Sequence, residues 1–413
     1  MSDGMSGTIT HCRACGAPFG PVFCDLGVMA VANSYLPPEA DPAAEPRFPL
    51  RAVVCSDCRM VQLDHVVDAH GIFRDYAYFS SASSSWLKHC LNFCTAMTDR
   101  LDLGPQSLVI EVASNDGYLL KNFVAAGVPC LGIEPAENVA TVARAAGVPT
   151  EAVFLTPDSA AAIVQRLGRQ ADLVVANNVL AHVPDINGFT QGLAALLAPE
   201  GVLSVEAPHL LAQVDGVQFD TIYHEHYAYW SLLAVEHLFT RHGLTVFDVE
   251  TLPTHGGSLR ILASPSPRPA SAALRGLRQL EAARGLASDA FYQGFGARVA
   301  GVLSGFRDWL AVQKRRGRRV AAYGAAAKGN TFLNAAGVTA GDLLAVADLS
   351  PAKQGRLLPG SHVPVVSPEA VLALAPDEIL ILPWNIAPEV VAQLRAAGFS
   401  GGLWTAVPEI RRW

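Results

Sequence analysis

The chain of 413 residues alternates between apolar strand patterns and helical patterns, and this alternation restricts the possible folds more than any other feature. The runs 108–113, 130–133, 173–177 and 202–206 predict strands, and helical patterns lie between them. Such alternation is typical of a mostly parallel sheet with helices on its faces. A shorter version of the theme recurs over 320–348. The sequence therefore predicts an α/β protein with two such units.

The first unit has the spacing of a nucleoside site. Small and polar residues fill the turn 114–117 after the first strand, and an acidic residue, Glu134, follows about twenty residues after the strand. A carboxylate at this spacing can hold ribose hydroxyls. A dinucleotide fingerprint needs three glycines in the turn, and only Gly117 is present. A nucleoside-bearing cofactor is expected, and the missing glycines count against NAD.

The turn itself resembles the first motif of class I S-adenosylmethionine-dependent methyltransferases, Asp/Glu-x-Gly-x-Gly-x-Gly. Here the motif reads Glu111-x-Ala113-x-Asn115-x-Gly117, with alanine and asparagine at two glycine positions. The resemblance implies that Glu111 lies near the amino acid end of the donor and Glu134 holds its ribose; a plain packing unit is the alternative. The predicted cofactor-binding residues, the last two at the end of the third strand, are Glu111, Ala113, Ser114, Asn115, Asp116, Gly117, Tyr118, Glu134, Pro135, Asn177 and Asn178.

Four of the eight cysteines form two Cys-x-x-Cys pairs, Cys12 with Cys15 and Cys55 with Cys58. Each pair presents two thiolates from one tight turn, which favours a tetrahedral zinc ion over a pair of redox sites. Four protein ligands leave no open position on the ion. We therefore expect a structural Zn²⁺ that holds together an N-terminal domain too small to fold without it.

The segment 219–229 concentrates chemically active side chains, although only 16% of the chain is charged and 8% aromatic. It contains Tyr223, His224, Glu225 and His226 in succession. Imidazole titrates near neutral pH, and a neighbouring carboxylate can fix its tautomer or raise its basicity. The segment predicts a site of proton transfer, and an ion-paired surface turn is the alternative.

The second α/β unit lies beyond a proline-rich linker at 264–269 that predicts a domain boundary. Its turn, 324–330, places Lys328 and Asn330 at a predicted helix N-terminus, where backbone N–H groups can hold an anion. Tight packing of the helix on its sheet is the alternative. The basic run 314–319 is expected to end a helix.

Composition narrows the classes of partner. A net charge of −7 argues against a general nucleic-acid binder. No apolar run is long enough to span a bilayer, and the first ten residues lack the order of a secretory signal. We expect a cytoplasmic protein that binds neither nucleic acid nor membrane.

Taken together, the motifs resemble the nucleotide-sugar C-methyltransferases of deoxysugar biosynthesis. The resemblance covers nearly the whole chain and keeps the order of the motifs. It implies a zinc-binding domain (1–80), a class I methyltransferase domain (81–264) and a C-terminal Rossmann-like domain (265–413) that binds the nucleotide-sugar. The motifs that carry it are the two Cys-x-x-Cys pairs, 76–85, 111–117, 223–226 and 324–330.

The resemblance also implies roles for single residues. His226 is the expected base, and we expect Glu225 to orient its ring, with Tyr223 and Tyr76 shaping the site. Tyr76, His182 and His224 are the candidate donors to an enolate oxygen. The substrate-binding residues, expected from the resemblance or from their place at the ends of strands and turns, are Ser81, His182, His224, Tyr323, Lys328 and Asn330.

The expected reaction is methylation at C3, next to the 4-keto group of a dTDP-linked deoxysugar with or without a 3-amino group. We expect a monomer. The alternatives are methylation at C5, methylation at oxygen or nitrogen, an NAD-dependent sugar oxidoreductase, and a module that binds a nucleotide-sugar without catalysis.

Overall fold

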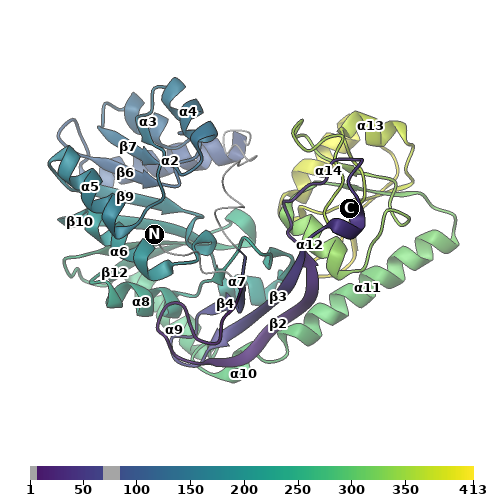
Figure 1. The fold of residues 1–413 in the computed structure, drawn as a ribbon, viewed down its shortest axis with the longest axis horizontal. Helices are drawn as coiled ribbons and strands as arrows, with labels where there is room; N and C mark the ends of the chain where they lie inside the picture. The colour runs from purple at the N-terminus through teal and green to yellow at the C-terminus, as the bar shows by residue number, and fades with distance from the viewer. Residues whose placement is uncertain (1–6, 68–83) are drawn as a thin grey trace.

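The computed structural model describes residues 7–67 and 84–413, and its three main sheets are joined by helices (Figure 1). A seven-stranded sheet and its helices form one lobe, and a six-stranded sheet forms the other. Long strands from the N-terminal part, purple in Figure 1, run between the two lobes. A small pair, β1 (Gly7–Thr8) with β5 (His65–Val66), accompanies them.

The central sheet has the order β12-β13-β10-β9-β6-β7-β8, and only β13 runs antiparallel to its neighbours. This confirms the first of the two expected α/β units. The strands are β6 (Val109–Val112), β7 (Cys130–Ile133), β8 (Thr150–Glu151), β9 (Ala171–Asn177), β10 (Leu197–Pro208), β12 (Thr245–Leu252) and β13 (Ser258–Ser264). The helices of this lobe are α2 (Ser84–Leu101), α3 (Leu120–Ala125), α4 (Glu137–Ala145), α5 (Pro157–Leu167), α6 (Ile186–Leu196), α7 (Leu210–Asp215) and α8 (Leu232–Arg241).

Apolar side chains on both faces explain why these strands read as continuous apolar runs. Successive side chains of a strand point to opposite faces of the sheet. Val109 packs with Phe93 and Phe123 on one face, whereas Ile110 packs with Phe189 on the other. The sheet is therefore buried by helices from both sides, as parallel sheets usually are.

The N-terminal sheet has the order β11-β4-β3-β2 and takes one strand from the middle of the chain. That strand, β11 (Ala228–Tyr229), pairs with β4 (Val61–Leu63) directly after the histidine cluster. Neither β11 nor the twelve-residue β2 (Phe19–Ala30) is predicted by a pattern in the sequence. Strand β2 pairs with β3 (Arg47–Cys55). Strand β2 is half exposed and bulged, so its apolar pattern is weak.

The C-terminal sheet has the order β16-β15-β14-β17-β18-β19 and is parallel except for β19. This confirms the second α/β unit. Its strands are β14 (Val320–Tyr323), β15 (Val346–Ala347), β16 (Val365–Val366), β17 (Glu378–Ile381), β18 (Gly402–Thr405) and β19 (Arg411–Arg412). Its helices are α12 (Ala327–Ala335), α13 (Pro368–Ala373) and α14 (Ala387–Ala396).

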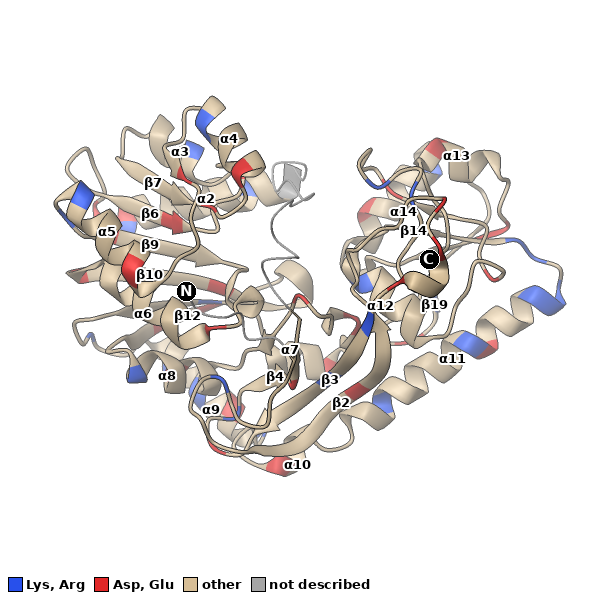
Figure 2. Ribbon diagram, viewed as in Figure 1, with Lys and Arg blue, Asp and Glu red and all other residues tan. Residues whose placement is uncertain are grey.

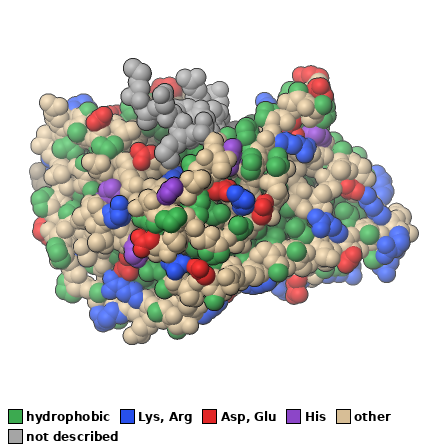
Figure 3. All heavy atoms as spheres, turned by 60° about the horizontal axis from the view of Figure 1, so that its bottom comes forward, with side chains coloured by type: hydrophobic (Ala, Val, Ile, Leu, Met, Phe, Trp, Pro, Cys, Tyr) green, Lys and Arg blue, Asp and Glu red, His purple; other side chains and the backbone are tan. Residues whose placement is uncertain are grey.

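Three helices follow the linker: α9 (Ala272–Ala283), α10 (Asp289–Tyr292) and α11 (Phe295–Arg315). Helices α10 and α11 are separated at Gly294, which adopts a left-handed conformation with φ 85°. The basic run begins in the last turn of α11, as expected, and the far end of this helix is basic in Figure 2. Within the described residues, no helix is long and apolar enough to cross a bilayer. On the face drawn in Figure 3, basic side chains gather toward one end.

Candidate functional site

The turn after β6 has the backbone that its motif predicts. Ala113, Asn115 and Gly117 all have positive φ values, of 57°, 49° and 77°. Glycine adopts this conformation freely, asparagine tolerates it, and alanine adopts it at a cost of about 1 kcal/mol. The backbone at the two substituted motif positions is therefore the one that the generic glycines would adopt.

Glu134 lies between the turns that follow β6 and β7. Its carboxylate accepts hydrogen bonds from the backbone N–H of Asn115 (3.0 Å) and of Ala136 (2.9 Å). Burial raises the pKa of Glu134, and the two N–H donors lower it in part. Pro135, which follows it, is half-buried. The carboxylate is thus held at the carboxyl edge of the sheet, where a ribose would be bound.

Other buried polar groups lie at the same edge of the sheet. Glu111 is 1% exposed, and burial raises its pKa well above the usual value, with a further rise from the charge of Glu134. The side-chain oxygens of Asn177 and Asn178, at the end of β9, have no hydrogen-bond partner among the described residues. Buried polar atoms are normally paired, so these amides fit a polar ligand such as the methyl donor predicted from the sequence. The other predicted residues of this turn, Ser114, Asp116 and Tyr118, are buried beside them.

His226 is fixed by a hydrogen bond on each ring nitrogen. Nδ1 lies 2.9 Å from the carbonyl oxygen of Thr221, and Nε2 accepts a hydrogen bond from the hydroxyl of Tyr223. A carbonyl only accepts, so Nδ1 carries the hydrogen and Nε2 keeps its lone pair. Burial is the main cause that lowers the pKa of His226 well below 6.5, and the charges of His182, Lys328 and His255 lower it further. The ring is therefore neutral near pH 7 and can accept a proton at Nε2.

His182 lies against this ring and is held by the same segment. The two ring centroids are 4.6 Å apart, and Nδ1 of His182 donates to the backbone carbonyl of Glu225 over 2.8 Å. Burial lowers the pKa of His182 to about 4. Its Nε2 is consequently also an acceptor, which suits a hydroxyl or amine donor.

The structure corrects the role expected for Glu225. Its carboxylate accepts from the backbone N–H of Asn33 at 3.3 Å, and the His226 ring is oriented by the Thr221 carbonyl instead. Burial raises the pKa of Glu225 to about 7. His224 also faces away from His226, because its Nε2 lies 3.3 Å from the carbonyl of Phe48 in β3. His224 and Glu225 lie in a turn, and neighbouring side chains there point in different directions.

In the C-terminal lobe the predicted residues do not all converge. The Tyr323 hydroxyl donates to Gln393 at 2.8 Å, and Asn330 donates to the carbonyl of Ala32 at 3.2 Å. A side chain at Gly324 would lie 2.4 Å from Pro383, so this glycine allows the turn to pack against the end of β17. Lys328 points toward the central lobe, with its ammonium 5.2 Å from the centre of the Trp384 ring.

Sequence reasoning missed several charged groups around the site. Glu206 is fully buried and binds Arg260 (2.6 Å) and His89 (2.9 Å). Burial alone would raise the pKa of Glu206, but these two partners lower it. His255 and the buried Asp220 also lie near Lys328 and were not predicted. No local pattern marks them, because each meets its partners only through tertiary contacts. Tyr76 and Ser81 lie outside the described residues.

The four predicted cysteines come together. Their sulfur atoms all lie within 4.8 Å of one another; Sγ of Cys15 is 3.3 Å from Cys55, and Sγ of Cys12 is 3.6 Å from Cys58. Tetrahedral Zn²⁺ with Zn–S bonds of about 2.3 Å needs sulfur separations of about 3.8 Å. Gln62 donates an N–H to Cys12 Sγ at 3.1 Å, as outer-shell donors to thiolates do. The set fits a closed structural zinc ion.

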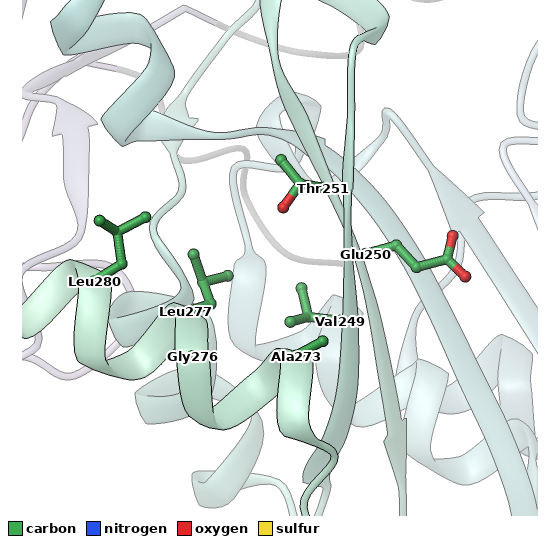
Figure 4. A pocket seen from close by; sticks show the side chains of 7 residues that line it. All are labelled: Val249, Glu250, Thr251, Ala273, Gly276, Leu277 and Leu280. Atoms are coloured by element: carbon green, nitrogen blue, oxygen red, sulfur yellow. The ribbon is translucent and has the colours of Figure 1, made fainter.

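A large hollow in the described part of the chain lies away from this chemistry. A pocket of about 590 Å³ lies between β12 and α9 (Figure 4). Glu250, the one charged residue that lines it, points away from α9 in Figure 4 and pairs with Arg260. The remaining lining is almost entirely apolar, with Leu277 and Leu280 on the helix. Nothing in this lining could act as a base near the histidine cluster.

Comparisons with known proteins agree with this arrangement. A family model described as "Putative zinc binding domain" matches residues 12–73, one described as "Methyltransferase domain" matches 89–249, and one described as "C-methyltransferase C-terminal domain" matches 253–408. Solved structures are more distant. Magnesium protoporphyrin IX methyltransferase from Synechocystis PCC 6803, with bound SAM, is 15% identical over 49% of this chain and 99% of that one, with a TM-score of 0.35. The PH0226 protein from Pyrococcus horikoshii OT3 is 13% identical over 48% and 99%, with a TM-score of 0.36.

A curated relative matches over the whole length. The chain is 36% identical to C-methyltransferase NovU of Streptomyces niveus over 409 residues, which are 98% of this chain and 96% of that protein. The protein is therefore a methyltransferase with a zinc-binding N-terminal part, and its methyl donor is S-adenosylmethionine. The chain belongs to the S-adenosylmethionine-dependent sugar C-methyltransferase family.

Proposed function

We propose that this enzyme methylates C3 of a dTDP-linked 4-keto-deoxysugar, the carbon next to the keto group. The observation that supports this most directly is the tautomer of His226, whose Nε2 keeps a lone pair within a buried cluster. A carbon beside a ketone is acidic enough to be deprotonated only by a well-placed base. Methylation at oxygen or nitrogen would need only a base or none and no keto group, so the position of the new methyl group decides between them.

The proposed reaction has two steps, removal of the C3 proton and transfer of the methyl group to C3. His226 Nε2 takes the C3 proton, the C–H electron pair forms the C3–C4 double bond, and the carbonyl pair moves to the oxygen. S-adenosylmethionine supplies an electrophilic methyl group when bound. The enolate carbon then bonds to that carbon, and the sulfur keeps the electron pair of the broken S–C bond while the ketone is restored.

The enolate oxygen needs a hydrogen-bond donor or a cation. His182 is poorly suited, because its hydrogen on Nδ1 is already donated to the Glu225 carbonyl. His224 faces Phe48. Tyr76, the third candidate, lies outside the described residues. Among the described residues, the Tyr223 hydroxyl lies against His226 Nε2 and could turn toward the substrate oxygen, which would leave that nitrogen to take the proton. We propose Tyr223 as this donor.

The test is to incubate the enzyme with methyl-labelled S-adenosylmethionine and a panel of dTDP-4-keto-deoxysugars that carry a 3-amino or a 3-hydroxyl group. We expect one product whose NMR spectrum shows a new methyl singlet on a quaternary C3. Methylation at C5 would instead give two methyl singlets on C5. A label found on oxygen or nitrogen would contradict the proposal.

A further inference from the structure

A hydrogen bond from the C-terminal lobe reaches the segment that holds the base. Trp384, in the short helix η6 (Trp384–Ile386), donates its indole N–H to Asp220 over 2.7 Å. Asp220 belongs to η4 (Phe219–Thr221), which packs against α12, and it is 1% exposed. The two residues are 164 positions apart, so only the tertiary structure brings them together.

Asp220 is directly followed by the residue that orients His226. The carbonyl of Thr221 accepts the hydrogen of His226 Nδ1 at 2.9 Å. The Thr221 hydroxyl donates to the carbonyl of Gln218 at 2.7 Å, and the Gln218 amide donates to Gly256 at 2.8 Å. A shift of Asp220 would therefore move the peptide that fixes the base.

The indole ring is itself held on two sides. The ammonium of Lys328 lies over its face, 5.2 Å from the ring centre. Gly256 lies against its edge, where a Cβ atom would be 2.4 Å from the indole, so only glycine leaves room. This packing aims the indole N–H at the carboxylate of Asp220.

We propose that Trp384 is a positioning residue for the catalytic base: through Asp220 and Thr221 it holds the His226 ring in the orientation that keeps the hydrogen on Nδ1 and the lone pair on Nε2. This inference rests on the proposed function, in which His226 is the base. The C-terminal lobe then serves proton removal as well as substrate binding.

The test compares Trp384→Phe with Trp404→Phe. Trp404, in β18, donates its indole N–H to Glu378 over 2.7 Å, so the control loses a similar bond in the same lobe whose acceptor is not in η4. We expect Trp384→Phe to lower kcat about tenfold or more, since small misplacements of a catalytic group are costly. Its Kd values for dTDP and for S-adenosylmethionine should stay within about twofold of those of the wild type. The control, Trp404→Phe, should resemble the wild type in kcat and in both Kd values.

The step carried out by the base can be measured alone. In D₂O and without methyl donor, the enzyme should exchange the C3 hydrogen of the dTDP-4-keto-deoxysugar for deuterium. Trp384→Phe, Asp220→Ala and the double variant should slow this exchange to a similar degree, because all three remove the hydrogen bond between the indole and Asp220. Asp220→Asn, which keeps an acceptor for the indole, should restore much of the rate. Melting temperatures check that each variant is folded, and the comparison of Asp220→Ala with Asp220→Asn tests the contact if Trp384→Phe does not fold.

Other outcomes would overturn the inference. If Trp384→Phe exchanged the C3 hydrogen within about twofold of the wild-type rate, Trp384 would not position the base. The same conclusion would follow if only the dTDP affinity changed, or if the effects of the two substitutions were additive in the double variant. Normal exchange in a His226→Asn variant would instead refute the proposed function. The two failures are therefore distinguishable.

Discussion

At the residue scale, the hydrogen on His226 Nδ1 decides what the ring can do. The Thr221 carbonyl fixes this tautomer, and no charge is required of Glu225. A buried neutral imidazole is a weaker base than an exposed one, but it is in its basic form throughout the physiological pH range.

Replacing His226 by Asn should abolish turnover, with a loss of about 10² to 10⁴ in kcat, because a general base typically contributes that much. The asparagine amide can still donate to Thr221, so the fold and the S-adenosylmethionine Kd should be preserved. His224→Gln is the control, since His224 faces Phe48 and its replacement should leave kcat nearly unchanged. Product formation near the wild-type rate in His226→Asn would exclude this base.

The pH dependence should show the lowered pKa of His226. Burial and the nearby His182, Lys328 and His255 all disfavour its charged form. The base is lost only on protonation, so the acid limb of kcat/KM should lie below pH 6.5, with a plateau from about pH 6.5 to 8. A half-maximal rate at or above pH 6.5 on the acid side would contradict this assignment.

At the element scale, the turn between β6 and α3 combines a special backbone with close packing. Gly117 has φ 77°, and a Cβ there would lie 2.9 Å from Val148 and 3.3 Å from Ala143. The turn is therefore pressed against the neighbouring α4–β8 connection, which fixes where the predicted donor residues lie.

Gly117→Ala should destabilise the protein by about 2–4 kcal/mol, from backbone strain and overpacking together. Gly147→Ala is a matched control, because Gly147 has φ 83° but a Cβ atom there would meet no other atom within 4 Å. It should lose only about 1 kcal/mol. Urea unfolding measures both. Equal losses in the two variants would show that packing at Gly117 contributes nothing.

At the scale of the whole molecule, the zinc site and the histidine cluster are coupled. Arg13, between two cysteine ligands, donates to the carbonyls of Val183 (3.2 Å) and Pro184 (3.0 Å), next to His182. Strand β11 begins two residues after His226 and belongs to the same sheet as β3, which ends at Cys55. The metal therefore supports the active site without a chemical step of its own.

Removing the metal with a chelator, or replacing Cys58 by Ser, should lower Tm by at least about 5 °C and reduce kcat, because structural zinc contributes directly to folding. Added Zn²⁺ should restore the chelated protein. Cys24→Ser, a buried cysteine outside the cluster, should keep its zinc content. Unchanged Tm and activity in the metal-free protein would disprove this coupling.

Much of the fold could be predicted because its signals are local. Strand β7 has the predicted limits, since buried parallel strands are short continuous apolar runs between turns. The turn 113–117 was recognisable because asparagine and glycine favour positive φ. Strands β11 and β19, two residues each, have no such signal and exist only because a neighbouring strand is present.

The sequence by itself determined the order of the α/β units, the zinc ligands and the segment that carries the proposed base, because each depends on residues close together in the chain. Only the tertiary structure decided how the base is oriented. The contact of Trp384 with Asp220 joins residues 164 positions apart, and the His224 and Glu225 side chains were directed away from His226 by packing against the N-terminal part. Such contacts follow from how whole elements fill space, which no local pattern records.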